Sequence, residues 1–128
     1  MNSIIKIIEQ YNGKELTLGR LDCLTMLFSI LGRDDLLELT RDRYKTVRGG
    51  LVRLPKLTGI TAISELLVKT HRLVDPRFVQ DYDLLVQGGT HTFVYFQGSL
   101  FGVFDNAFQM KAINLPLQVP NSVLYRLK

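Results

Sequence analysis

Residues 22–32 read Asp-Cys-Leu-Thr-Met-Leu-Phe-Ser-Ile-Leu-Gly, a pattern in which both ends of a helix are marked. Asp22 is a favourable N-cap, because its carboxylate can accept hydrogen bonds from the free amides of a first helical turn. Gly32 supplies the C-terminal stop. The apolar residues between them recur at helical spacing and predict one buried stripe, made of Met26, Leu27, Ile30 and Leu31. The stretch therefore predicts a buried helix over 23–31 that begins at Cys23.

The segments around this helix, up to about residue 70, have the same helical periodicity. Ser3 is a candidate N-cap for a first helix that ends near Gly13, and residues 15–20 make a short extended approach to Asp22. Further helices are expected over 34–39 and 62–69. The first part of the chain is therefore predicted to be helical.

After Pro76 the pattern changes to that of strands, with turn signals at Gly88-Gly89 and at residues 97–99. The candidate strands cover residues 82–86, 92–96, 100–104, 110–113 and 123–127. Helices followed by an antiparallel meander define an α+β fold, in which the N-terminal helices pack on a C-terminal sheet. We expect one domain over 1–128, with a helical half over about 1–75 and a strand half over about 76–128.

The composition fits a compact domain with a core and excludes several classes of protein. The 128 residues are 46% hydrophobic and 22% charged, which is not the composition of a disordered or low-complexity chain. A single cysteine excludes an intramolecular disulfide and a cysteine-cluster zinc site, and two histidines leave little for another metal site. The sequence has neither a P-loop nor a dinucleotide-binding glycine pattern. We therefore expect no metal and no cofactor.

The charge pattern gives little sign of an anionic partner. The net charge is +4, and the densest basic stretch, residues 41–56, contains Tyr44 as its one aromatic residue. Nucleic-acid binding would require more stacking residues among the cations, so we interpret the stretch as a solvated face and expect no nucleic-acid partner. Charged residues interrupt the isoleucines of residues 1–11, which predicts neither a signal peptide nor a membrane span.

Cys23 is the candidate nucleophile. A thiol at the first position of a helix lies among free amides and at the positive end of the helix dipole, so we expect its pKa to be lowered, with Arg20 acting in the same direction. The alternative is a small hydrophobic residue of the core.

His91, at the start of the most strand-like segment, is the candidate base, and Asp105 or Asn106 on the next strand could orient its ring. The alternative interpretation makes His91 a polar hairpin residue and 105–106 a turn. His71 competes as a base, but we expect it to lie on the surface beside Arg72.

In this order the motifs resemble those of a known family, the NlpC-type papain-like cell-wall hydrolases. The segment Leu16-Thr-Leu-Gly-Arg-Leu-Asp-Cys23, preceded by Tyr11-Asn-Gly-Lys, is similar to that family's nucleophile segment, in which a glycine precedes an Asp-Cys pair at the start of the central helix. Asp81-Tyr-Asp-Leu-Leu-Val86 and His91-Thr-Phe-Val-Tyr-Phe-Gln-Gly98 resemble its Gly-Asp-Leu strand and its His-led strand. A small phage-encoded branch also has counterparts of Asp42-Arg-Tyr44 and Ser122-Val-Leu-Tyr-Arg126.

The resemblance implies a papain-like fold and a cysteine peptidase or amidase that cuts peptidoglycan stem peptides during phage entry. Cys23 and His91 would form the catalytic pair, with Asp105 or Asn106 third. Phage relatives belong to tails or virions, so the expected location is the virion, after synthesis in the host cytoplasm, and the expected partners are other tail or virion proteins.

The alternative is a catalytically inactive fold that serves as a structural or assembly component of a tail or virion. It predicts an apolar protein contact through exposed aromatic residues among Phe101, Phe104 and Phe108.

Overall fold

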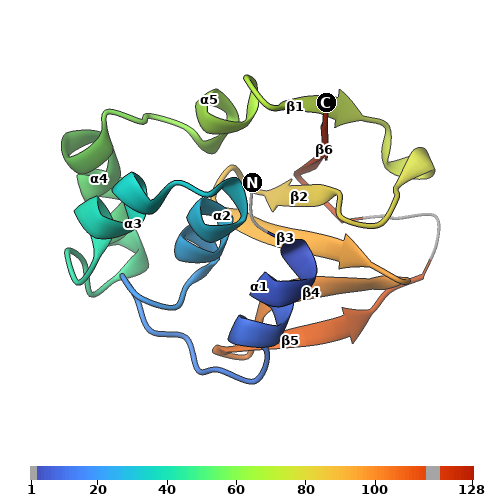
Figure 1. The fold of residues 1–128 in the computed structure, drawn as a ribbon, viewed down its shortest axis with the longest axis horizontal. Helices are drawn as coiled ribbons and strands as arrows, with labels where there is room; N and C mark the ends of the chain where they lie inside the picture. Colours follow the sequence, from blue (N-terminus) through green and yellow to red (C-terminus); the bar gives the residue numbers. More distant parts are fainter. Residues whose placement is uncertain (1–2, 115–118) are drawn as a thin grey trace.

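A computed structural model of the chain, which describes residues 3–114 and 119–128, has its helices in the N-terminal part and its sheet in the C-terminal part (Figure 1). The α+β prediction is therefore confirmed at this level. The helices are α1 (Ile4–Tyr11), α2 (Cys23–Leu31), α3 (Asp34–Thr40), α4 (Val47–Thr58), α5 (Ile63–Leu67) and the short 3₁₀ helix η1 (Pro76–Phe78). The strands are β1 (His71–Val74), β2 (Leu84–Gln87), β3 (His91–Phe96), β4 (Ser99–Phe104), β5 (Ala107–Ala112) and β6 (Ser122–Leu127).

Within the described ranges the strands form one six-stranded antiparallel sheet in the order β1-β6-β2-β3-β4-β5. The part from β2 to β5 is the expected meander. The C-terminal strand β6 then returns and lies between β1 and β2, with Tyr125 opposite both Leu73 and Leu84. Such long-range pairing leaves no trace in local periodicity, and the sequence patterns did not predict β1 at all.

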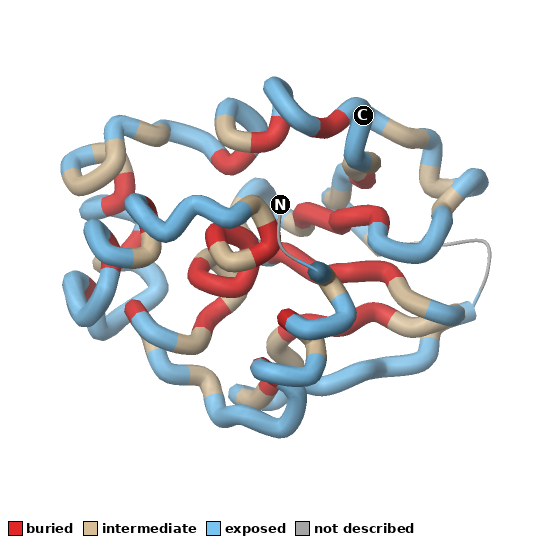
Figure 2. Tube along the Cα trace, viewed as in Figure 1, coloured by how far each residue is buried: buried red, intermediate tan, exposed pale blue. Residues whose placement is uncertain are grey.

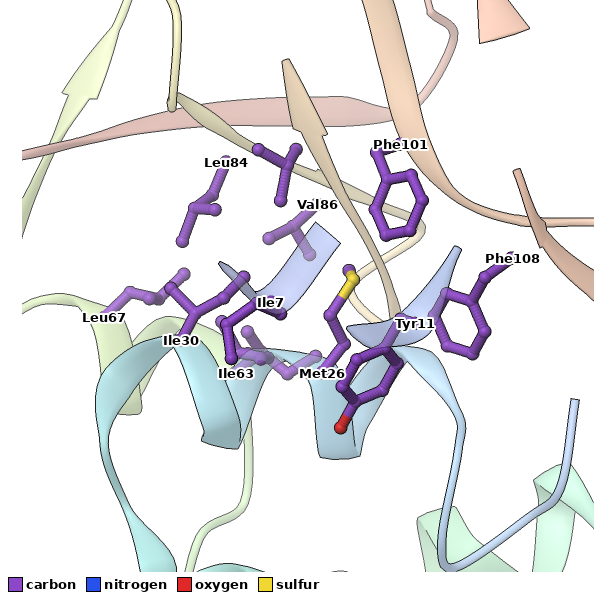
Figure 3. Close-up of a cluster of buried hydrophobic side chains, with 12 residues drawn as sticks. Ile7, Tyr11, Met26, Ile30, Ile63, Leu67, Leu84, Val86, Phe101 and Phe108 are labelled. Atoms are coloured by element: carbon purple, nitrogen blue, oxygen red, sulfur yellow. The ribbon is translucent and has the colours of Figure 1, made fainter. Parts of the chain in front are cut away.

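The main core lies between the helices and one face of the sheet (Figure 2). Figure 3 shows Met26 and Ile30 of α2 directed toward the side chains of the strands, beside Ile7 and Tyr11 of α1. Of the predicted stripe of α2, Met26, Leu27 and Ile30 are fully buried and Leu31 is partly buried. The other sheet face has a smaller cluster, whose buried members are Leu85, Phe93, Tyr95, Leu100 and Leu124.

An exposed contact was predicted among three aromatic residues, and two of them belong to the main core. Phe101 and Phe108 are fully buried, with their rings stacked at a centroid distance of 6.0 Å. Phe104 is partly buried and packs on Phe93 of the second cluster. The prediction was therefore wrong for Phe101 and Phe108, because alternate residues on neighbouring strands point toward the helices.

His71 was also expected on the surface, but its exposed fraction is 4%. It begins β1, and its Nδ1 lies 2.8 Å from the hydroxyl oxygen of Thr70. Burial lowers the pKa of His71, and the nearby charge of Asp83 partly opposes this effect. A buried imidazole at this edge of the sheet is structural, and it is not among the residues that line the pocket described below.

A buried ion pair joins the start of β2 to β6. The Asp83 side chain is 2% exposed and accepts from Nε and Nη2 of Arg126 at 2.9 and 2.8 Å. The guanidinium also donates to the carbonyl of Phe78 at 2.7 Å, and Asp83 accepts from the amide of Gln80. These contacts connect the segment before β2 to the C-terminal strand.

The sequence patterns did not predict α4, whose residues fell in the basic stretch interpreted as a solvated face. Gly49, Gly50 and Pro55 lie within this helix, and all three have low helix propensity. The helix forms because Thr46 caps it, with its side chain accepting from the amide of Gly49, and because Leu54 is buried against α2 and α3 residues. Tertiary packing therefore outweighs the local preference, and α4 becomes a wall of the site.

Candidate active site

The start of α2 is fixed by the carboxylate of Asp22, which is 3% exposed. Oδ1 accepts from the amide of Thr25 at 2.8 Å, while Oδ2 accepts from the amide of Gly19 at 2.9 Å and from the hydroxyl of Tyr44 at 2.5 Å. The Thr25 hydroxyl oxygen accepts in return from the Asp22 amide, which completes a capping box. The residue after Asp22 is therefore held in a fixed position.

Two glycines allow this arrangement to close. Gly19 has φ 81°, and a Cβ there would lie 2.9 Å from the backbone nitrogen of Asp42. Gly50 of α4 lies against the Tyr44 ring, and a Cβ would lie 2.9 Å from its Cδ2. Tyr44 is thus clamped between α4 and Asp22. Burial and the charge of Asp22 raise the pKa of Tyr44, which keeps its hydroxyl a hydrogen-bond donor.

Cys23, the first residue of α2, lies opposite the start of β3. Its Sγ is 3.7 Å from the carbonyl oxygen of Thr90 and 4.0 Å from Nδ1 of His91. The sulfur therefore lies within reach of the imidazole that the sequence singled out as its base. The His91 side chain is exposed, so one side of the pair is open to solvent.

The expected low pKa of Cys23 is wrong in direction. Burial raises the pKa of the Cys23 thiol, and the negative charge of Asp22 adds to this effect. The backbone amides of Thr92, Cys23 and Leu24 favour the thiolate but do not outweigh the burial. Arg20, which was expected to help, pairs instead with Asp42 at 2.6 Å. In the resting protein the sulfur is therefore a thiol that needs a base.

Asp105 and Asn106 form the two-residue turn between β4 and β5. Both have positive φ, 52° and 64°, as in the turns that connect tight hairpins. The β3–β4 register places this turn at the same end of the sheet as His91, but within the described residues no hydrogen bond joins either side chain to the imidazole. The carbonyl of Asn106 accepts from the amide of Leu16 at 2.7 Å. Their role as third catalytic residue stays a prediction.

A pocket of about 220 Å³ opens beside Cys23, between the start of α2, the β2–β3 turn and α4. Cys23 and His91 lie in its lining with Thr90 and Gly89 of the turn. Apolar side chains form most of the remaining wall: Leu16, Leu18, Leu24, Val47, Leu51, Leu54, Pro55, Ile63 and Val103. The pocket therefore combines one polar corner with apolar walls.

The sequence patterns missed the contribution of Tyr44 and of α4. Tyr44 was noted as the one aromatic residue in a basic stretch, and an aromatic residue isolated among charges was the available signal for a buried anchor. The apolar residues of α4 gave no clear signal, because two glycines and a proline interrupt them.

Among the described residues there is no group of histidine, cysteine or acidic side chains suited to hold a metal ion. No helix in the described ranges has the length and apolar character required to cross a bilayer. No protein-family model matches the chain, and neither a curated protein nor a solved structure matches it. Fold and site define an α+β protein whose one thiol and an imidazole share a pocket.

Proposed function

We propose that this chain is a papain-like cysteine peptidase or amidase of the NlpC type, carried in a phage tail or virion, which cuts amide bonds of peptidoglycan stem peptides. The observation that carries the proposal is the distance of 4.0 Å between Cys23 Sγ and His91 Nδ1 at the edge of an open pocket. A thiol at the start of a helix faces an imidazole on a strand, and their separation is at the long end of the range for a nucleophile and its base, which is often looser when no substrate is bound.

In the proposed reaction His91 Nδ1 takes the proton of the Cys23 thiol as the sulfur attacks the carbonyl carbon. The backbone amides at the start of α2 stabilise the oxyanion. The C–N bond then breaks, and the leaving amine receives the proton from His91. A water molecule attacks the thioester, gives one proton to His91, and releases the acid and the thiol. Because the raised pKa of Cys23 keeps the sulfur protonated, the thiolate nucleophile forms only when His91 takes the proton.

The conformation of Tyr82 supports the family resemblance. It stands where the Gly-Asp-Leu segment has its glycine, and it has φ 74°, a conformation that glycine adopts most easily. The next residue, Asp83, is the buried partner of Arg126. Tyr82 therefore has a positive φ at the position that corresponds to that glycine.

The second candidate is an inactive fold that serves as a structural component of the tail or virion. Two observations favour it: among the described residues no side chain other than Cys23 forms a hydrogen bond with the His91 ring, and burial keeps the thiol protonated. An imidazole without a third group is a less effective base, because its orientation and tautomer are not fixed.

Digestion of purified peptidoglycan tests the two candidates. Wild-type protein should release new amino groups and wall peptides, detected by mass spectrometry, and Cys23→Ala should release none. His91→Gln should lose at least about 10²-fold in rate, since general-base catalysis contributes this much or more. Equal release by wild type and Cys23→Ala would overturn the enzymatic proposal and support the structural one.

The third residue is tested in the same assay with Asp105→Ala and Asn106→Ala. Replacing the residue that orients His91 should lower the activity and also shift the lower limb of the pH–rate profile, because a neighbouring carboxylate or amide affects the protonation equilibrium of the imidazole. Loss of activity without a change in that profile would mean that the residue acts only through the hairpin turn.

A further inference from the structure

The walls of the pocket are apolar and carry no free charge. Of the described residues that line it, the acidic one is Asp22, whose carboxylate is occupied by three donors, and no lysine or arginine is among them. Val47 and Leu51 of α4 are about half exposed at its rim. Apolar surface left in water beside a reactive group favours an apolar ligand, since its burial is stabilising.

The reaction geometry indicates which part of a substrate occupies this pocket. The leaving group takes its proton from His91, so it lies on the exposed side of the catalytic pair. The acyl carbon is bonded to Cys23 Sγ, close to the first amides of α2. The remainder of the acyl group therefore extends away from His91, toward the walls formed by α4 and Ile63.

The volume sets the size of that group. A pocket of about 220 Å³ equals about seven water volumes of roughly 30 Å³ each. We propose that the pocket is the acyl-binding site of the cysteine hydrolase proposed above, on which this inference rests, and that it takes a neutral apolar chain of about five to seven carbon atoms. In a wall peptide, the residue that supplies the scissile carbonyl would then have an uncharged, apolar side chain.

The first experiment follows acylation with p-nitrophenyl esters of acetate, butyrate, hexanoate and dodecanoate. The burst of nitrophenolate gives the rate, and intact mass locates the acyl group on Cys23. Each buried methylene is worth about fourfold, so hexanoate should exceed acetate by at least about tenfold and by roughly 200-fold at most. Dodecanoate should gain nothing over hexanoate, because its chain exceeds the pocket volume.

Two variants of α4 with the same change of charge form a matched pair. Leu51→Glu places a carboxylate at the pocket, and Val52→Glu places one on the same helix at a position that does not line it. Both residues are about half exposed, 48% and 56%, so neither change should unfold the protein. The hexanoate-to-acetate ratio should fall several-fold in Leu51→Glu and stay at the wild-type value in Val52→Glu.

A second measurement does not depend on catalysis. Hexanamide should bind to Cys23→Ala and shift the methyl NMR signals of Leu51 and Ile63, whereas 6-aminohexanamide and the monoamide of adipic acid should bind at least about tenfold more weakly. If hexanamide binds but no ester acylates Cys23, the hydrolase proposal fails while the apolar site stands. Equal acylation rates with the acetate and hexanoate esters, or equal affinities for hexanamide and its two charged analogues, would overturn the proposed acyl-binding site.

Discussion

Removal of the Tyr44 hydroxyl is the sharpest test of how the start of α2 is held. In Tyr44→Phe the ring still packs on Gly50, and Asp22 loses one of three donors while it stays buried. A hydrogen bond to a charged group contributes about 1.5–3 kcal/mol, so we expect the free energy of unfolding to fall by about 2 kcal/mol. With a urea m-value of about 2 kcal/mol/M, the midpoint should fall by roughly 1 M.

The control is Tyr82→Phe, since the Tyr82 side chain is exposed and its hydroxyl makes no hydrogen bond within the described residues. Its midpoint should stay near the wild-type value. Asp22→Asn keeps an N-cap side chain but removes the charge. In the Asp22→Asn protein, Tyr44→Phe should therefore lower the free energy of unfolding by at least about 1 kcal/mol less than it does in the wild type. A midpoint change below about 0.3 M in Tyr44→Phe, or full additivity with Asp22→Asn, would refute the role given to this hydroxyl.

Three further predictions use urea unfolding or alkylation. Arg126→Ala leaves the buried carboxylate of Asp83 without its ion-pair partner and should lower the free energy of unfolding by about 3–5 kcal/mol. Arg77→Ala breaks an exposed ion pair and should lower it by less than about 1 kcal/mol. Equal losses in the two variants would contradict the argument from burial. Alkylation of Cys23 by iodoacetamide should rise with a midpoint above the ordinary thiol value of about 8.5, because burial raises its pKa, and in urea the midpoint should return to that value. The raised pKa also means that this thiol stabilises the fold at pH below its unfolded pKa, and that the contribution is lost as the pH rises through the folded pKa. Gly50→Ala should lower the free energy of unfolding by about 1 kcal/mol despite its better helix propensity, because the new Cβ meets the Tyr44 ring; a gain in stability would show that the ring can move.

Helix α2 was predicted with its observed bounds, Cys23–Leu31, because Asp22 and Gly32 mark its ends by local chemistry. Helix α4 was not, because its stability comes from contacts with residues distant in sequence. The position of β6 between β1 and β2 was missed for the same reason. Cap residues and local periodicity therefore predicted the elements whose ends they determine, but they could not predict pairing between segments distant in sequence.

The candidate site likewise has features that local sequence predicts and features that depend on contacts between distant residues. Cys23 and His91 could be singled out because a helix start and a strand start place side chains at predictable ends of elements. The direction of the Cys23 pKa shift could not be predicted, since it depends on how far residues distant in sequence, such as Thr90 of the β2–β3 turn, bury the sulfur. The side-chain directions of Asp105 and Asn106 depend on a turn with positive φ, which the sequence suggested without fixing its geometry.

The position of β6 also sets the order in which this protein can fold during synthesis. Strand β6 is made after β1 to β5 and pairs with both β1 and β2, so the sheet lacks an inner strand until residues 122–127 have left the ribosome. Paired residues of β6 and its two neighbours are separated by 35 (122−87) to 56 (127−71) positions, and such long-range pairing slows folding because the loop must close before the contacts form. Until then β1 and β2 each have an unpaired edge. Nascent chains at that stage can pair with each other through these edges and aggregate.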